Sequence, residues 1–383
     1  MTVVHLRRAE PGLLVIAADG APLVTDAAPA LDVLVLDVVG GQLSWSLFDS
    51  ALIPAAVLDD ADAAQDWVWA VYGEDVALAV ADNRPRTLTA APARPESAAA
   101  LRRLAYAHWA IRWWPASTID AIPALDPVLL AEEIAMLTEQ CEMMIDGAVD
   151  ERFTEPDRET ETYDDGAAPN DGIRESIPAS SGDGEPSNGL GGRAPTDEAE
   201  SIGRSRGRAE DYALAAGEGS SDGLIVARGS GGWDWRRCPP GILDAGEKSV
   251  SWQVARAEGM STVRVNVVAA PACRHEGPPH LRPYARVRSA DAGHDRTPPA
   301  HMEFTTPLRL RGDSWTGAVR IPGPPETSPD IAVFVPGVGP ADPAEESAMR
   351  ERIRRFARLR LTELTGHPRL SAETAAADAD EDF

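Results

Sequence analysis

The sequence predicts an α+β N-terminal domain, an acidic disordered linker, and an all-β, sandwich-like C-terminal domain with a terminal helix. Three observations lead to this fold class. Apolar residues recur at helical spacing before residue 145, and they alternate with polar residues after residue 250. Between these regions, Asp, Glu, Gly, Ser and Pro dominate. The predicted boundaries are 1–145, 146–225 and 226–342, then an Arg-rich amphipathic helix over 343–366 and an acidic tail over 367–383.

Short strands open the N-terminal domain. Leu13–Ala17 is a brief apolar run, and two alternating segments, Asp32–Val39 and Gln42–Phe48, flank Gly40–Gly41. A glycine pair between two such segments is typical of a two-residue hairpin turn. We expect a further strand at Val76–Ala81.

Helices complete this domain. The first is expected over Asp60–Tyr72 and the second over about Glu96–Trp114, where an apolar stripe includes His108 and predicts a buried histidine. The third begins with Asp126 as N-cap and Pro127 at the first helical position. Its packing seam repeats at 4-3-4-3 spacing and consists of Leu130, Ile134, Leu137, Cys141 and Met144.

The middle of the chain predicts disorder and holds half of the acidic excess. The chain has 383 residues and a net charge of −25. Residues 1–145 contain 8 basic and 20 acidic residues, residues 146–225 contain 7 and 20, and residues 226–383 contain 21 and 21. The linker has only three aromatic residues, so it cannot bury enough apolar area to offset the loss of chain entropy.

Alternation with period two predicts six short antiparallel strands in the C-terminal domain. They centre on Val250–Val254, Val263–Val267, Ala285–Val287, Leu308–Leu310, Trp315–Ile321 and Ile331–Val335. Asp342, Pro343 and Glu345 then form a helix-start signature, and Gly366 with Pro368 ends the helix. Ser371–Phe383 is expected to be a solvated tail.

A cluster of unusual residues lies near the start of this domain. Gly229–Gly232 is expected to be the flexible end of the linker, and Trp233 and Trp235 follow it. We favour these tryptophans as an anchor on the sandwich, because their side chains bury a large area. One alternative is that the glycines form a phosphate-cradling loop. The other is a reactive thiol at Cys238, since the neighbouring arginines could lower the pKa of this thiol.

Two further motifs have simple structural explanations. Cys273, His275 and His280 lack a fourth ligand at a convincing spacing, so we predict no metal site there and no cofactor. Arg311–Asp313 spells an adhesion tripeptide, but Gly312 and Asp313 are better explained as a hairpin turn.

Arginines form the strongest candidate for a binding surface. Six of them fall on the outward side of the predicted C-terminal strands: Arg264, Arg286, Arg288, Arg309, Arg311 and Arg320. The terminal helix adds Arg350, Arg352, Arg354, Arg355, Arg358 and Arg360. Two interpretations stay open, a solvated face and a surface that docks the acidic linker or an acidic partner. The predicted partner-binding residues are the six strand arginines with Trp233 and Trp235.

Composition indicates the compartment and source. The sequence lacks an apolar run of transmembrane length and a signal peptide, and its three cysteines are too few for a disulfide framework. We therefore expect a cytoplasmic protein without a membrane partner. Thirty-five arginines against one lysine, Lys248, indicate GC-rich coding of the actinobacterial kind.

The sequence favours a non-enzymatic adaptor or accessory protein that binds other proteins, within a bacterial multi-gene regulatory or defence system. Familiar catalytic motifs are missing, and a long tether between ordered modules suits the binding of separate partners. The first alternative is an enzyme of unfamiliar type that uses His108 or the acids near Gly40–Gly41. The second is a nucleic-acid accessory protein that uses the arginines, which the net charge disfavours.

Overall fold

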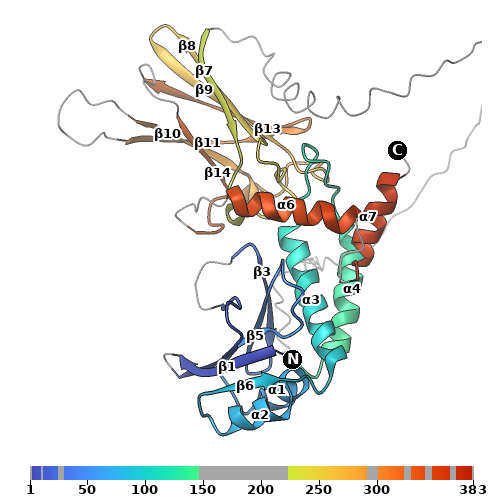
Figure 1. Cartoon of the computed structure of the whole chain (residues 1–383). Helices are drawn as coiled ribbons and strands as arrows, with labels where there is room; N and C mark the ends of the chain where they lie inside the picture. The colour runs from blue at the N-terminus through green and yellow to red at the C-terminus, as the bar shows by residue number, and fades with distance from the viewer. Residues whose placement is uncertain are drawn as a thin grey trace, which may run out of the picture. The chain divides into compact units, whose positions relative to one another are not determined.

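The computed structural model describes residues 2–9, 12–24, 30–145, 223–290, 301–322, 329–340, 347–362 and 368–381. The predicted acidic linker, 146–225, lies outside these residues except for its last three. The described residues before and after it belong to one compact unit, Met1–Gly147 together with Arg206–Phe383. The α+β, linker and sandwich-like organisation with a terminal helix is confirmed at this level (Figure 1).

A six-stranded antiparallel sheet forms the N-terminal region, in the order β3-β4-β5-β2-β1-β6. Its strands are β1 (Thr2–Ala9), β2 (Leu13–Ala17), β3 (Val33–Val38), β4 (Gly41–Ser46), β5 (Ala55–Leu58) and β6 (Arg86–Ala90). The predicted hairpin is confirmed, because β3 pairs with β4 from Val33↔Ser46 to Val38↔Gly41. Its turn lies one residue earlier than expected, at Val39 and Gly40, and Gly40 has a φ of 73°.

Four helices accompany this sheet among the described N-terminal residues. They are α1 (Gln65–Tyr72), α2 (Glu74–Ala81), α3 (Pro95–Trp113) and α4 (Pro127–Cys141). The predicted strand at Val76–Ala81 is wrong, because this segment is most of α2. Gly73, with a φ of 92°, ends α1 and lets a second helix begin at once, and Glu74 and Asp75 suit the positive end of its dipole.

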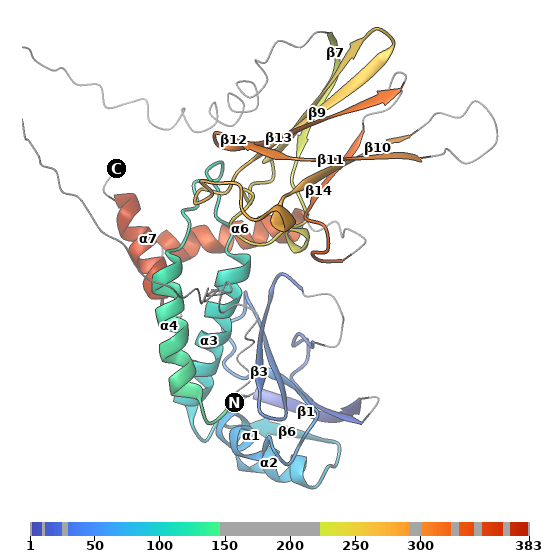
Figure 2. The same cartoon turned by 180° about the vertical axis from the view of Figure 1, so that it is seen from behind.

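The long helices α3 and α4 agree with their sequence signals. The Asp126 carboxylate accepts hydrogen bonds from the backbone N–H of Val128 (2.8 Å) and Leu129 (3.4 Å), as an N-cap should. Leu130, Leu137 and Cys141 are buried along the expected seam. The two helices lie side by side in both views (Figure 2).

Two antiparallel sheets make up the C-terminal region. One has the order β11-β10-β14 and the other has the order β12-β13-β9-β8-β7. Their strands are β7 (Leu224–Gly231), β8 (Val250–Ala257), β9 (Met260–Val268), β10 (Tyr284–Ala290), β11 (His301–Pro307), β12 (Arg309–Arg311), β13 (Ser314–Pro322) and β14 (Asp330–Phe334). Its described residues also include the 3₁₀ turns η2 (Trp235–Arg237) and η3 (Pro279–Leu281).

Strand β7 corrects the sequence interpretation of the glycine-rich segment. Gly229, Ser230 and Gly231 are not a flexible linker end, because they pair with β8. Gly229 faces Trp252, and a Cβ there would come within 2.5 Å of the indole ring. The glycine is therefore needed so that the indole can cover this part of the strand.

Helices α6 (Ser347–Thr362) and α7 (Ser371–Glu381) end the described chain. The predicted start signature, Asp342 to Glu345, and Gly366 lie outside the described residues. The prediction of a solvated tail is wrong for Ser371–Glu381, which is helical. Ala372 and Glu373 are fully buried, and α7 packs against α4 and α6. Small alanine side chains on one side of α7 allow this close approach. The acidic composition of the segment does not predict that the helix is packed.

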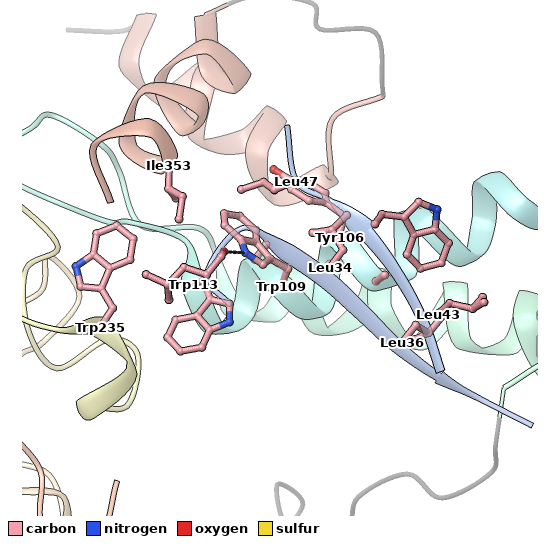
Figure 3. Packing of buried hydrophobic residues seen from close by; sticks show 14 of the residues in the cluster. Leu34, Leu36, Leu43, Leu47, Tyr106, Trp109, Trp113, Trp235 and Ile353 are labelled. Carbon is pink, nitrogen blue, oxygen red and sulfur yellow. Dashed lines mark hydrogen bonds between the residues drawn. The ribbon is translucent and has the colours of Figure 1, made fainter. Parts of the chain in front are cut away.

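One hydrophobic cluster connects the two regions. Figure 3 shows Trp235 from the C-terminal region, Ile353 from α6 and Trp113 from α3 as members of this cluster. A buried polar junction lies beside it: Asp244 accepts hydrogen bonds from Ser117 Oγ and from the backbone N–H of Thr118, both at 2.7 Å. Burial raises the pKa of Asp244, and these hydrogen bonds oppose the shift. In the part of the chain that the structure describes, no helix is both long and apolar enough to span a membrane.

Candidate functional site: an arginine-bearing face of the five-stranded sheet

Four of the predicted arginines share one face of the five-stranded sheet. Val263, Val265 and Val267 are fully buried on the opposite face of β9, so Arg264 points away from the core. Directly opposed residues of antiparallel strands share a face. The register sets Arg264 opposite Ala318 and Arg320 opposite Thr262. Strand β12 adds Arg309 and Arg311 opposite Thr316 and Ser314.

A hollow of ≈ 960 Å³ lies at one end of this face, and we call it the arginine hollow. It is lined by Gly223, Gln253, Ala255, Arg256, Ala257, Glu258, Met260, Thr262, Arg264 and Arg320. The tight β8–β9 turn forms one edge, where Glu258 and Gly259 have φ values of 51° and 79°. Positive φ at both central residues is the type I′ geometry that matches the twist of paired strands.

The arginine hollow carries unpaired hydrogen-bond donors. Arg264 and Arg320 have no ion-pair partner among the described residues. Gln253 Nε2 is buried and has no hydrogen-bond partner in the same part of the chain. A buried amide donor without an acceptor is uncommon in native proteins. The charged lining groups are Arg256, Arg264, Arg320 and Glu258, so the hollow offers mostly cationic and amide donors.

Two other predicted arginines, Arg286 and Arg288, do not share this face. They lie on β10, which belongs to the three-stranded sheet, so the expectation of one common arginine face is wrong for them. Alternation within a strand assigns a side, but it cannot assign a strand to a sheet. Arg288 Nε lies 3.0 Å from Glu303 on β11. The Arg286 guanidinium lies 5.8 Å from the ring centroid of Phe334 on β14.

Trp233 and Trp235 are buried, as the anchor interpretation predicts. Trp233 is 7% exposed, Trp235 is 4% exposed, and Trp233 Nε1 donates to the backbone oxygen of Asp244 at 2.7 Å. They pack inside the molecule, so the prediction that they belong to a partner-binding surface is wrong.

The segment after these tryptophans does not form a reactive thiol site. Cys238 is buried, and this burial raises the pKa of its thiol despite the neighbouring Arg237 charge. Its neighbour Arg236 pairs with both carboxylate oxygens of Asp234, at 3.0 and 2.9 Å. Sequence analysis did not select Arg237, which is 6% exposed and lies 5.0 Å from the Phe334 ring centroid. Arg237 directly follows Arg236, and an arginine pair in a turn gives no sequence signal that its side chains are buried.

Three of the six α6 arginines, Arg350, Arg354 and Arg360, are buried. Arg350 and Arg354 are buried and pair with Glu247, at 2.8 and 3.3 Å. Arg354 also pairs with Asp120 at 3.3 Å, and Arg360 pairs with Glu373. These arginines therefore join α6 to its own chain. Arg352 lies over the Phe48 ring, and Arg355 is exposed.

The residues of the enzyme alternative are placed differently from the prediction. His108 is exposed rather than part of the core. Its surroundings still lower its pKa by desolvation, and the charge of Asp37 on β3 opposes this shift. The Gly40 turn is closed, because a Cβ at Gly40 would meet the backbone oxygen of Asp60 at 2.3 Å. This close approach of two backbone segments agrees with a hairpin turn.

The remaining motifs stay local. Cys273 Sγ lies 3.7 Å from the backbone oxygen of His275, and no group of three or more His, Cys, Asp or Glu side chains in the described ranges could hold a metal ion. The predicted turn at Gly312 is confirmed by its φ of 63° and by the Arg311↔Ser314 pair. No protein-family model, curated protein or solved structure matches this chain.

Proposed function

We propose that this protein is a non-enzymatic accessory or adaptor protein that binds an acidic segment of a partner protein in the arginine hollow. The observation that supports this proposal is the coincidence of a concave surface, two unpaired arginines and an orphan amide donor at Gln253. Carboxylates are acceptors that suit arginine in a bidentate geometry. An extended acidic segment supplies several of them in a row.

Nucleic acid suits the arginine hollow less well. Proteins that hold single strands place aromatic rings under the bases, and no aromatic residue is among the described residues that line the hollow. The chain as a whole carries a charge of −25, which opposes the approach of a long polyanion. A short acidic segment needs only the local positive field of the hollow.

The acidic stretch of the chain itself is the competing occupant. Residues 146–225 contain 20 acidic residues, and they are covalently linked to the sheet that forms the hollow. A tethered segment acts at an effective concentration in the millimolar range, so it would compete with a partner. The acidic stretch and a partner segment would both bind through carboxylates, so an experiment is needed to distinguish them.

The test uses the full chain and a fluorescent peptide of ten glutamates, with binding followed by anisotropy. We expect affinity to fall as salt increases and to fall about tenfold or more in Arg264→Glu/Arg320→Glu, because exposed ion pairs contribute up to about 1 kcal/mol each. Arg355→Glu on α6 changes the same kind of charge outside the hollow and should bind normally. Absence of binding to wild-type protein at low salt, or equal losses in the control, would refute the proposal.

A further variant identifies the competitor. Replacing the acidic residues of 146–222 by their amides should tighten peptide binding if this stretch occupies the arginine hollow. Unchanged affinity would leave the partner segment as the occupant. The proposal places the protein in the cytoplasm, where the three free cysteines would stay reduced.

A further inference from the structure

A second group of arginines lies on the three-stranded sheet, away from the arginine hollow. Arg237 from η2 and Arg286 from β10 both lie against the ring of Phe334, with guanidinium carbons 5.0 and 5.8 Å from its centroid. Two cations thus share one aromatic ring. Attraction to the ring offsets only part of the repulsion between them.

Neither of these two arginines forms a direct ion pair among the described residues. Nε and Nη1 of Arg237, and Nε of Arg286, are buried without a hydrogen-bond partner there. The nearest acid in sequence, Asp234, is engaged in two hydrogen bonds to Arg236. On β11, Glu303 pairs with Arg288. Asp330 on β14 lies opposite Arg288 in the register and is exposed.

The electrostatics agree with this geometry. Burial lowers the pKa of Arg237, and the charges of Arg286 and Arg288 lower it further. The charges of Asp234 and Cys238 oppose this shift without cancelling it. An arginine that is 94% buried beside like charges needs a compensating anion, because an uncompensated buried charge is strongly unfavourable.

We propose that Arg237 and Arg286, held by the Phe334 ring, form a binding site for a small phosphate-bearing ligand. A phosphate carries about −1.5 to −2 charges near pH 7, which matches two unpaired guanidinium groups. Its oxygens accept the paired N–H groups of arginine. A single carboxylate would neutralise only one of the two cations. The site is independent of the arginine hollow, which lies on the other sheet.

Inorganic phosphate and phenyl phosphate are the probes, with binding measured by calorimetry and by thermal unfolding of the full chain. We expect phosphate to raise the melting temperature above that in chloride of the same ionic strength, because a ligand that binds only the folded state stabilises it. Tighter binding of phenyl phosphate than of free phosphate would identify a monoester as the ligand. The reverse order would identify the free anion.

Arg286→Gln is the decisive variant, since its backbone pairing stays intact. It should weaken phosphate binding about tenfold or more, as expected for the loss of a hydrogen bond to a charged group. In phosphate-free buffer it should raise the melting temperature, because it removes a like charge from Arg237. Arg264→Gln in the arginine hollow is the matched control, and it should leave phosphate binding unchanged.

Three results would overturn the proposal. The first is a wild-type melting temperature that phosphate does not raise above the chloride control. The second is equal weakening in Arg286→Gln and Arg264→Gln, which indicates general charge screening. The third is a lower melting temperature of Arg286→Gln without phosphate together with full phosphate binding, which indicates that Arg286 only packs on Phe334.

Discussion

A buried ion pair between α6 and α7 gives the most direct prediction for stability. Arg360 is 2% exposed and Glu373 is fully buried. Arg360 Nε donates to Glu373 Oε1 at 2.9 Å, Tyr106 donates to the same oxygen at 2.6 Å, and the backbone N–H of Leu370 donates to Oε2 at 2.7 Å. The carboxylate of Glu373 thus depends on Arg360 for its counter-charge.

Substitution of Arg360 by Met keeps an apolar side chain of similar length and removes the charge. The Glu373 carboxylate then stays buried with two neutral donors and no cation. Removing one partner of a buried pair costs about 3–5 kcal/mol, so we expect a loss of this size in the free energy of unfolding. Arg358→Met is the control. Arg358 pairs with Glu351 at 3.3 Å and with Asp120 at 3.6 Å, and its side chain is 39% exposed. Such exposed pairs contribute about 0–1 kcal/mol each.

Urea unfolding followed by circular dichroism measures both variants, and amide hydrogen exchange of α7 reports local detachment. The double variant Arg360→Met/Glu373→Gln removes the stranded charge and should recover at least half of the loss. This recovery also tests the idea if Arg360→Met alone fails to fold. The reasoning would be refuted if Arg360→Met lost no more unfolding free energy than Arg358→Met. It would also be refuted if the loss in the double variant equalled the sum of the losses in Arg360→Met and Glu373→Gln alone.

Two further predictions concern ionisable groups. Burial raises the pKa of all three thiols, that of Cys141 to about 11, but Cys273 alone is partly exposed. A thiol reagent should therefore label Cys273 first, as mass spectrometry of timed samples would show, and early labelling of Cys238 would contradict this. Burial raises the pKa of Glu247, but hydrogen bonds and charges from Arg350 and Arg354 outweigh it and leave the pKa below 4.5. The stability that these ion pairs contribute is present above pH 4.5 and is lost as pH falls through the lowered pKa of Glu247. The difference in unfolding free energy between wild type and Glu247→Gln, measured in urea, should therefore shrink in acid. A difference that does not change with pH would contradict this prediction.

Local patterns with a fixed period were sufficient for most of the fold. Alternation identified β8, β9 and β13, and the N-cap of Asp126 followed by Pro127 gave the start of α4. These signals work because each residue's environment follows from its neighbours in sequence. The prediction of a strand at Val76–Ala81 was wrong because a run of six apolar residues suits a buried strand and a buried helix equally well.

The missed features depend on contacts between distant residues. The burial of α7 depends on the Arg360–Glu373 pair and on Arg103, which donates to Glu133 and to the backbone oxygen of Arg369. Nothing in the composition of an acidic, alanine-rich tail indicates these partners. Likewise, alternation placed Arg286 on the outward side of its strand. It could not show that this strand, β10, belongs to a different sheet from β9, which carries Arg264.

Counter-charges, rather than the density of arginine, distinguish the binding candidates from the structural arginines. The helix richest in arginine directs Arg350, Arg354 and Arg360 into ion pairs with buried or half-buried carboxylates. On the strands, Glu276 and Glu303 engage Arg309 and Arg288. Among the strand arginines selected from the sequence, Arg264, Arg286, Arg311 and Arg320 lack such a partner in the described structure. A cation with an internal partner must give up that partner to bind a ligand, whereas an unpaired cation gains one. The unpaired residues are therefore those whose substitution should change binding more than stability, and those of α6 should do the reverse.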